Sequence, residues 1–139
     1  MRVTNRSAAG DTPAALLSIR PHFAEAIFAG AKVVEFRRRR LPDDISRLIL
    51  YETYPHQRVT GECRVLGQEV SAPDAIWEWA RFHGALSEAE FVKYFSGSAY
   101  AVAIVVGHVR RWDSPRTLAQ IGVTSPPQSW KRLACPPVV

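Results

Sequence analysis

Gly30-Ala31-Lys32-Val33-Val34-Glu35-Phe36-Arg37-Arg38-Arg39-Arg40 is the most informative segment of this chain, because it joins a helix-like run to a strand-like one. Successive side chains of a strand point to opposite faces of a sheet, so Val34 and Phe36 share one face, which belongs in a core. Glu35 and Arg37 then lie together on the other face, with Lys32 just before the strand. One acid among several cations suits a polar, partly anionic ligand.

Apolar periodicity and turn residues around this segment predict an α+β fold, a small mixed β-barrel with about three helices. Gly30 stands where the glycine that ends a helix is expected. Ser87-Glu88-Ala89-Glu90 is a capping box that starts another helix, and Gly107 indicates a bulge in a long apolar strand. The predicted strands cover residues 16–20, 33–39, 47–54, 59–70, 99–106 and 108–112, and the predicted helices begin near residues 21, 73 and 87.

The 139 residues correspond to one domain, and a hydrophobic content of 47% suffices for a sizeable core. We predict a mobile leader over residues 1–14, a single domain over residues 15–133 and a loose tail over residues 134–139. The sequence shows no signal peptide and no long apolar run, which predicts a cytoplasmic protein that does not bind membranes. Its two cysteines lack metal-ligand spacing, so neither a metal nor another cofactor is expected.

Arginine dominates the positive charge of the chain. The formal net charge is +5, and fifteen of the eighteen cationic residues are Arg. Arginine binds phosphate through planar, paired hydrogen bonds and also stacks on bases. A composition bias toward Arg is the alternative explanation, although the clusters at residues 37–40, 110–111 and 116 are harder to explain in that way. The charge favours a nucleic-acid partner over a membrane.

The pattern Gly-x-Lys-x-x-Glu-x-Arg, filled by Gly30, Lys32, Glu35 and Arg37, resembles the signature of the ASCH domain, a member of the PUA-like β-barrel superfamily. The resemblance extends over about residues 15 to 133. A closing Pro-Pro-Gln-Ser-Trp loop at residues 126–130 resembles that of a subgroup described as predicted transcriptional regulators with a PUA-like domain. The resemblance therefore implies a PUA-like (ASCH) β-barrel and a regulatory role.

In relatives that hydrolyse acetylated cytidine, the lysine matching Lys32 is the reacting residue, and a threonine stands where this chain has Glu35. If the chain is an enzyme, the resemblance thus implies Lys32 as a catalytic residue, and Glu35 is predicted as its catalytic partner in a lysine–carboxylate pair. The threonine difference argues against that particular reaction. A lysine acts as a nucleophile or base only where burial or a nearby cation lowers its pKa, and Arg37 is such a neighbour. Without the family pattern, Lys32 reads as an ordinary surface lysine.

The predicted ligand-binding residues are cations, one acid, aromatic rings and two small polar side chains: Lys32, Glu35, Arg37, Arg38, Tyr51, Tyr54, Trp112, Gln128 and Ser129. The arginines would hold phosphate, and Gln128 and Ser129, in a stiff loop after two prolines, would read a base edge. An unpaired base would stack on Tyr51, Tyr54 or Trp112, although most aromatic residues in strands belong to cores.

The sequence therefore favours recognition of nucleic acid, either RNA or a single-stranded or modified nucleotide, in a cleft lined by the motif. Two alternatives stay open. One is a metal-independent enzyme that uses Lys32, either a hydrolase of an acylated nucleoside or a ribonuclease. The other is a sensor of a small, nucleotide-like anionic metabolite. The sequence predicts no particular protein partner.

Overall fold

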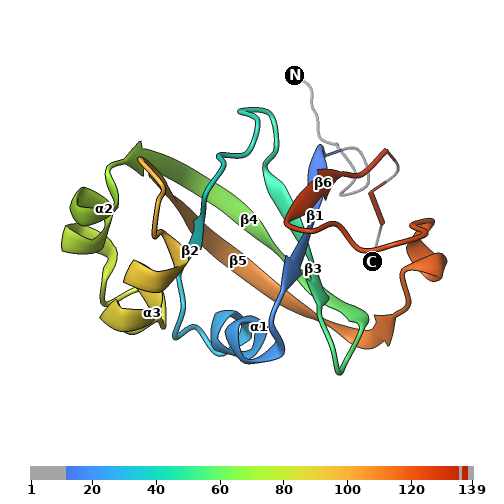
Figure 1. Ribbon diagram of the computed structural model, residues 1–139. Helices are drawn as coiled ribbons and strands as arrows, with labels where there is room; N and C mark the ends of the chain where they lie inside the picture. The colour runs from blue at the N-terminus through green and yellow to red at the C-terminus, as the bar shows by residue number, and fades with distance from the viewer. Residues whose placement is uncertain (1–11, 135, 138–139) are drawn as a thin grey trace, which may run out of the picture.

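The computed structural model describes residues 12–134 and 136–137, which form one curled sheet with helices against it (Figure 1). The sheet has six strands in the order β2-β5-β4-β3-β1-β6; it confirms the predicted α+β fold, and the sheet is curled into a half-barrel. Strands β1 and β3 are parallel, and all other neighbours are antiparallel. The strands are β1 (Ala14–Ile19), β2 (Val34–Arg37), β3 (Arg47–Glu52), β4 (Arg58–Ser71), β5 (Ala101–Arg116) and β6 (Trp130–Arg132).

Two long strands, β4 and β5, run through the whole sheet and bend it. Their pairing register shifts at three places, and such β-bulges increase the local twist and curvature of a sheet. One shift lies opposite residues 107–110, where Gly107 was predicted to mark a bulge. His108, one residue further on, takes the positive φ of 48°. The predicted bulge is therefore confirmed, and its unusual backbone falls on the next residue.

Three helices cover parts of the sheet: α1 (Pro21–Phe28), α2 (Pro73–Ala80) and α3 (Glu88–Tyr94). A single 3-10 turn, η2 (Ala119–Ile121), follows β5. Gly30 has a φ of 81° just beyond α1, as expected for a glycine that ends a helix. The capping box between Ser87 and Glu90 is confirmed at the start of α3. These local signals fix where α1 ends and where α3 begins beside the site.

Hydrophobic residues form three clusters. The first lies between α1 and the sheet and includes Leu17, Leu48 and Ile104. The second, on the opposite face of β1 and β3, includes Leu16 and Ile49. The third packs α2 and α3 against β2 and β5. Because alternate residues of β1 and β3 enter different clusters, both faces of these strands are buried.

Two predicted strands are shorter in the structure. β2 ends at Arg37 instead of residue 39, because its pairing with β5 stops there and the following arginines are exposed. β3 ends at Glu52, before a turn with a cis Tyr54–Pro55 bond. The outer parts of the predicted leader (1–14) and tail (134–139) lie outside the described residues, so both stay predictions. Among the described helices, none is long and apolar enough to cross a membrane.

Candidate functional site

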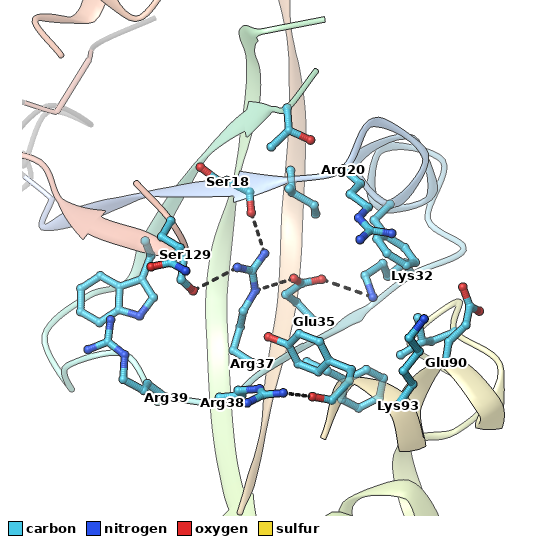
Figure 2. A pocket seen from close by; sticks show the side chains of 18 residues that line it. Ser18, Arg20, Lys32, Glu35, Arg37, Arg38, Arg39, Glu90, Lys93 and Ser129 are labelled. Carbon is cyan, nitrogen blue, oxygen red and sulfur yellow. Dashed lines mark hydrogen bonds and ion pairs between the residues drawn. The ribbon is translucent and has the colours of Figure 1, made fainter. Parts of the chain in front are cut away.

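A cleft of roughly 1050 Å³ opens where the end of β2 faces the start of α1, the helix α3 and the segment before β6 (Figure 2). Its lining comes from five separate parts of the chain, so no single motif encodes it. The residues around it are Ser18, Ile19, Arg20, Phe23, Lys32, Glu35, Phe36, Arg37, Arg38, Arg39, Thr53, Leu86, Glu90, Lys93, Tyr94, Gln128, Ser129 and Trp130.

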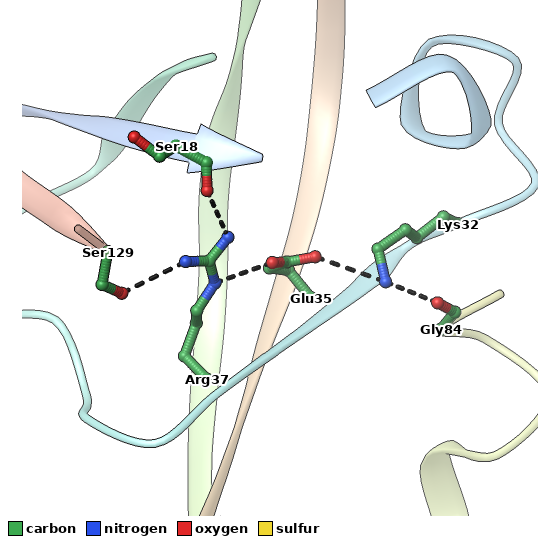
Figure 3. Close-up of polar contacts among 6 residues, drawn as sticks. All are labelled: Ser18, Lys32, Glu35, Arg37, Gly84 and Ser129. Carbon is green, nitrogen blue, oxygen red and sulfur yellow. Dashed lines mark hydrogen bonds and ion pairs between the residues drawn. The ribbon is translucent and has the colours of Figure 1, made fainter. Parts of the chain in front are cut away.

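A chain of buried charges crosses this cleft (Figure 3). The Arg37 Nε donates to Glu35 Oε2 at 2.7 Å, and the Lys32 Nζ lies 3.3 Å from Glu35 Oε1. Lys32 also donates to the backbone carbonyl of Gly84. The three charged residues are at most 9% exposed. The acid predicted among cations is thus present, but it is a buried bridge between two cations and not a solvent-facing group.

Arg37 joins the two edges of the curled sheet. Besides Glu35 on its own strand, it donates through Nη2 to the Ser18 carbonyl at 2.8 Å and through Nη1 to Ser129 Oγ at 3.1 Å. Strand β2 is one edge of the sheet, whereas Ser18 and Ser129 belong to the region of the other edge. All three nitrogens of the guanidinium therefore have partners, and Arg37 closes the barrel as well as lining the cleft.

The surroundings of Lys32 are partly aromatic. Its ammonium lies 4.9 Å from the ring centroid of Phe23 and 5.5 Å from that of Phe36, distances at which a cation is attracted to a ring. Gly84 offers Lys32 its carbonyl, and a Cβ added at Gly84 would lie 2.2 Å from Phe36. Only glycine leaves room there for this arrangement of lysine and phenylalanine.

Burial and charge act in opposite directions on the ionisable groups of the network. Burial lowers the pKa of Lys32 below its usual value, and the nearby Glu35 only partly opposes this. Burial alone would raise the pKa of Glu35, but the charges of Arg37 and Lys32 outweigh it and hold that pKa below the usual carboxyl range. Glu35 is therefore ionised at neutral pH, and the buried network has more cations than anions.

Further cations surround the cleft. Arg20, Arg38, Arg39 and Lys93 line it, and none of them forms an ion pair among the described residues. Together with Lys32 and Arg37 they make six cationic side chains against two carboxylates, those of Glu35 and Glu90. An excess of four positive charges lies in one cleft of a chain whose formal net charge is +5. Such a concentration attracts an anionic ligand.

Six of the nine predicted ligand-binding residues meet in this cleft: Lys32, Glu35, Arg37, Arg38, Gln128 and Ser129. The three predicted stacking residues do not. Tyr51 and Trp112 are buried in the second hydrophobic cluster, and the Trp112 indole donates to Glu62 at 3.1 Å. Tyr54 is 81% exposed but lies outside the cleft lining. Burial of both faces of β3 is the reason that its aromatic residue packs in a core.

Several lining residues were not singled out in the sequence, among them Arg20, Lys93 and Tyr94. Arg20 directly precedes the proline that starts α1, and Lys93 and Tyr94 end α3. No local pattern distinguishes them from surface residues, because only the packing of α3 beside β2 brings them to the motif. No group of metal-ligating side chains is found within residues 12–134 and 136–137.

Comparison with known proteins fits this architecture. No protein-family model matches the chain. The crystal structure of ASCH from Zymomonas mobilis superposes with a TM-score of 0.79 and 32% identity, covering 87% of each chain. The chain belongs to the ASCH domain family. A serine-to-alanine variant of the Zymomonas protein superposes with a TM-score of 0.80 at 31% identity, covering 88% of this chain and 89% of that one.

By sequence, this ASCH domain is 35% identical over 99 residues to an ASCH domain-containing ribonuclease of Zymomonas mobilis, covering 69% of this chain and 66% of that protein. It is also 27% identical over 119 residues to an ATP synthase subunit alpha of Ureaplasma parvum, covering 85% of this chain. The chain spans just under two thirds of the ribonuclease and 15% of the ATP synthase subunit. The predicted membership of a regulator subgroup stays a prediction.

Proposed function

We propose that this ASCH domain binds single-stranded RNA in the cleft between β2, α1 and α3. One observation carries the proposal: four uncompensated positive charges line an open cleft whose walls also offer aromatic rings and the polar side chains of Gln128 and Ser129. The positive charges attract the phosphates of a polyanion, and the aromatic rings and polar side chains can bind unstacked bases. If every cation of the cleft were paired with a carboxylate, the cleft would not favour an anionic ligand.

The experiment for this proposal is a fluorescence anisotropy titration of labelled single-stranded RNA at two salt concentrations. Arg20→Ala and Lys93→Ala remove exposed cations of the cleft without touching the buried network. Each should weaken binding and reduce the slope of log affinity against log salt by about 0.7, the contribution of one phosphate contact on a single strand. Arg81→Ala, at an exposed arginine outside the cleft, is the matched control and should change neither quantity.

A second activity, cleavage of the bound RNA, is favoured by the relative named as a ribonuclease. The ribose 2′-oxygen would form a bond to the adjacent phosphorus while the bond from phosphorus to the 5′-oxygen breaks. Lys32 would act in its neutral form, which burial favours by lowering its pKa; it would accept the 2′-hydroxyl proton and become the cation counted above, and the released 5′-oxygen takes a proton from water. Glu35, held ionised, would orient Lys32 and Arg37 and has no proton to donate.

Cleavage is tested on the same RNA by denaturing gel, with and without a chelator. Products ending in 2′,3′-cyclic phosphate and 5′-hydroxyl are expected, and a single 2′-deoxy substitution should block cleavage at that position. Lys32→Met should abolish cleavage, with circular dichroism confirming that the variant is folded. RNA that binds and stays intact would reject the enzymatic part alone. Stabilisation by a mononucleotide without any RNA binding would favour the sensor of a small anionic metabolite.

A further inference from the structure

Four aromatic rings line the cleft, and they differ in how much surface they offer to a ligand. Phe36 is buried in the third hydrophobic cluster, and Phe23 and Trp130 are partly buried and pack against the first. Tyr94, the last residue of α3, is 38% exposed. Among the cleft-lining rings that the structure describes, Tyr94 has the most accessible position, although no sequence pattern indicated a function for it.

The ring of Tyr94 is fixed in place from two sides. Arg38 lies with its guanidinium carbon 5.3 Å from the ring centroid and donates a hydrogen bond to the Tyr94 carbonyl, so it holds both ring and backbone. The ring of the buried residue Phe95 packs edge-on against the Tyr94 ring, with 4.7 Å between the two ring centroids and an interplanar angle of 82°. A ring held in this way loses little conformational freedom when a flat ligand packs on it.

The surroundings of Tyr94 also supply positive charge. The neighbouring Lys93 lines the same cleft, and burial raises the pKa of the Tyr94 hydroxyl, with smaller effects from the charges of Arg37, which lowers it, and Glu35, which raises it. The tyrosine is therefore within electrostatic reach of the buried network and beside a free cation. A base on the ring would leave its phosphate near Lys93 and Arg38, where positive charge is available.

We infer that Tyr94, backed by Arg38, is the surface on which one nucleobase of the bound RNA stacks. This inference rests on the proposed function, since it assigns a residue within the same cleft. It replaces Tyr51, Tyr54 and Trp112, the residues that the sequence suggested for stacking and that the structure places elsewhere. Stacking of a base on an aromatic side chain contributes about 1–3 kcal/mol, which corresponds to a roughly 5- to 150-fold change in affinity.

The test uses an oligouridine of about eight nucleotides whose 2′-oxygens are methylated, so that it cannot be cleaved. Its dissociation constant is measured with wild type, Tyr94→Leu, Tyr94→Phe and Tyr100→Leu. Tyr100 is 62% exposed and lies outside the cleft lining, which makes it a matched control. We expect Tyr94→Leu to weaken binding at least fivefold, and Tyr94→Phe and Tyr100→Leu to bind like wild type.

The first part of a second measurement uses wild type alone, so it does not depend on any variant folding. The same oligonucleotide is made with one base removed at each position in turn and titrated against wild type. Removal of the base at one position should lower the affinity for wild type about as much as Tyr94→Leu does. Removal of that base should lower the affinity for the Tyr94→Leu protein no further, as a double-mutant cycle requires.

The possible failures are distinguishable. If wild type binds RNA and Arg20→Ala weakens it, but Tyr94→Leu does not, the stacking inference is wrong and the proposed function stands. Tyr54→Leu is titrated alongside these proteins, and a loss of affinity with Tyr54→Leu in place of Tyr94→Leu would move the stacking surface out of the cleft and overturn the inference. An equal loss of affinity with Tyr94→Phe would assign the effect to the hydroxyl group and overturn the stacking inference. Absence of any RNA binding by wild type would overturn the proposed function and the inference together.

Discussion

Replacing Glu35 by glutamine should strongly destabilise the protein. The carboxylate is 5% exposed and lies between Lys32 and Arg37, at 3.3 Å and 2.7 Å from their nitrogens. Glutamine keeps the size but removes the charge, which leaves two buried cations without their shared anion. Breaking a buried ion pair from one side costs about 3–5 kcal/mol, a large part of the roughly 5–15 kcal/mol that stabilises a domain.

The assay is urea denaturation at pH 7, supported by thermal melting. At about 3–4 °C per kcal/mol for a domain of this size, Glu35→Gln should lower the melting temperature by about 10–20 °C. Glu25→Gln is the control with the same chemical change, because Glu25 pairs with Arg111 at 2.7 Å on the surface, with both side chains about half exposed or more. An exposed pair of this kind contributes at most about 1 kcal/mol.

The pH dependence provides an independent check. The pKa of Glu35 is lower in the folded protein than in the unfolded chain. The stability that the Glu35 carboxylate provides is therefore fully present above the ordinary carboxyl pKa of 4.5, and it is lost as pH falls through the lower pKa of the folded state. The difference between wild type and Glu35→Gln should therefore shrink in acid.

The variant should also become more stable as pH rises toward 10.5. Without Glu35, burial and Arg37 lower the pKa of Lys32 further, and the folded state then binds fewer protons than the unfolded chain. A Glu35→Gln variant within about 0.5 kcal/mol of wild type at pH 7 would refute this reasoning.

Two further predictions concern the sheet. In a Cys135→Ser chain, the Cys63 thiol should resist alkylation at pH 8 until the protein is unfolded. The reason is that burial, together with the charges of Glu35 and Glu62, raises the pKa of this thiol to about 12. Rapid alkylation of Cys63 in the native protein would contradict this prediction. Gly61→Ala should destabilise the fold by about 1–3 kcal/mol in urea denaturation, because its Cβ would lie 2.5 Å from the Arg110 carbonyl oxygen and 2.6 Å from the Phe28 ring. Gly67→Ala is the control in the same strand, because nothing lies within 4 Å of its new Cβ. It should change the free energy of unfolding by less than about 0.5 kcal/mol. Equal effects at the two glycines would show that the Cβ at position 61 is not crowded by Arg110 and Phe28.

Local sequence signals were sufficient for several features around the cleft. The capping box at Ser87 and the glycine at position 30 mark helix ends through hydrogen bonds and backbone angles of neighbouring residues alone. Alternation along a strand likewise placed Val34 and Phe36 on one face and Glu35 and Arg37 on the other. Each of these features depends on interactions within a few residues, which is why they could be predicted.

What covers each face of a strand was decided by the tertiary structure. Glu35 and Arg37 were expected to point away from the core, and they do so into a space closed by the other edge of the sheet, where Ser129 lies 92 residues away in sequence. The same packing buries Tyr51 in a core and brings Tyr94 from α3 to the cleft. A sequence fixes which side chains share a face through backbone geometry, but burial and charge depend on segments that meet only when the sheet curls.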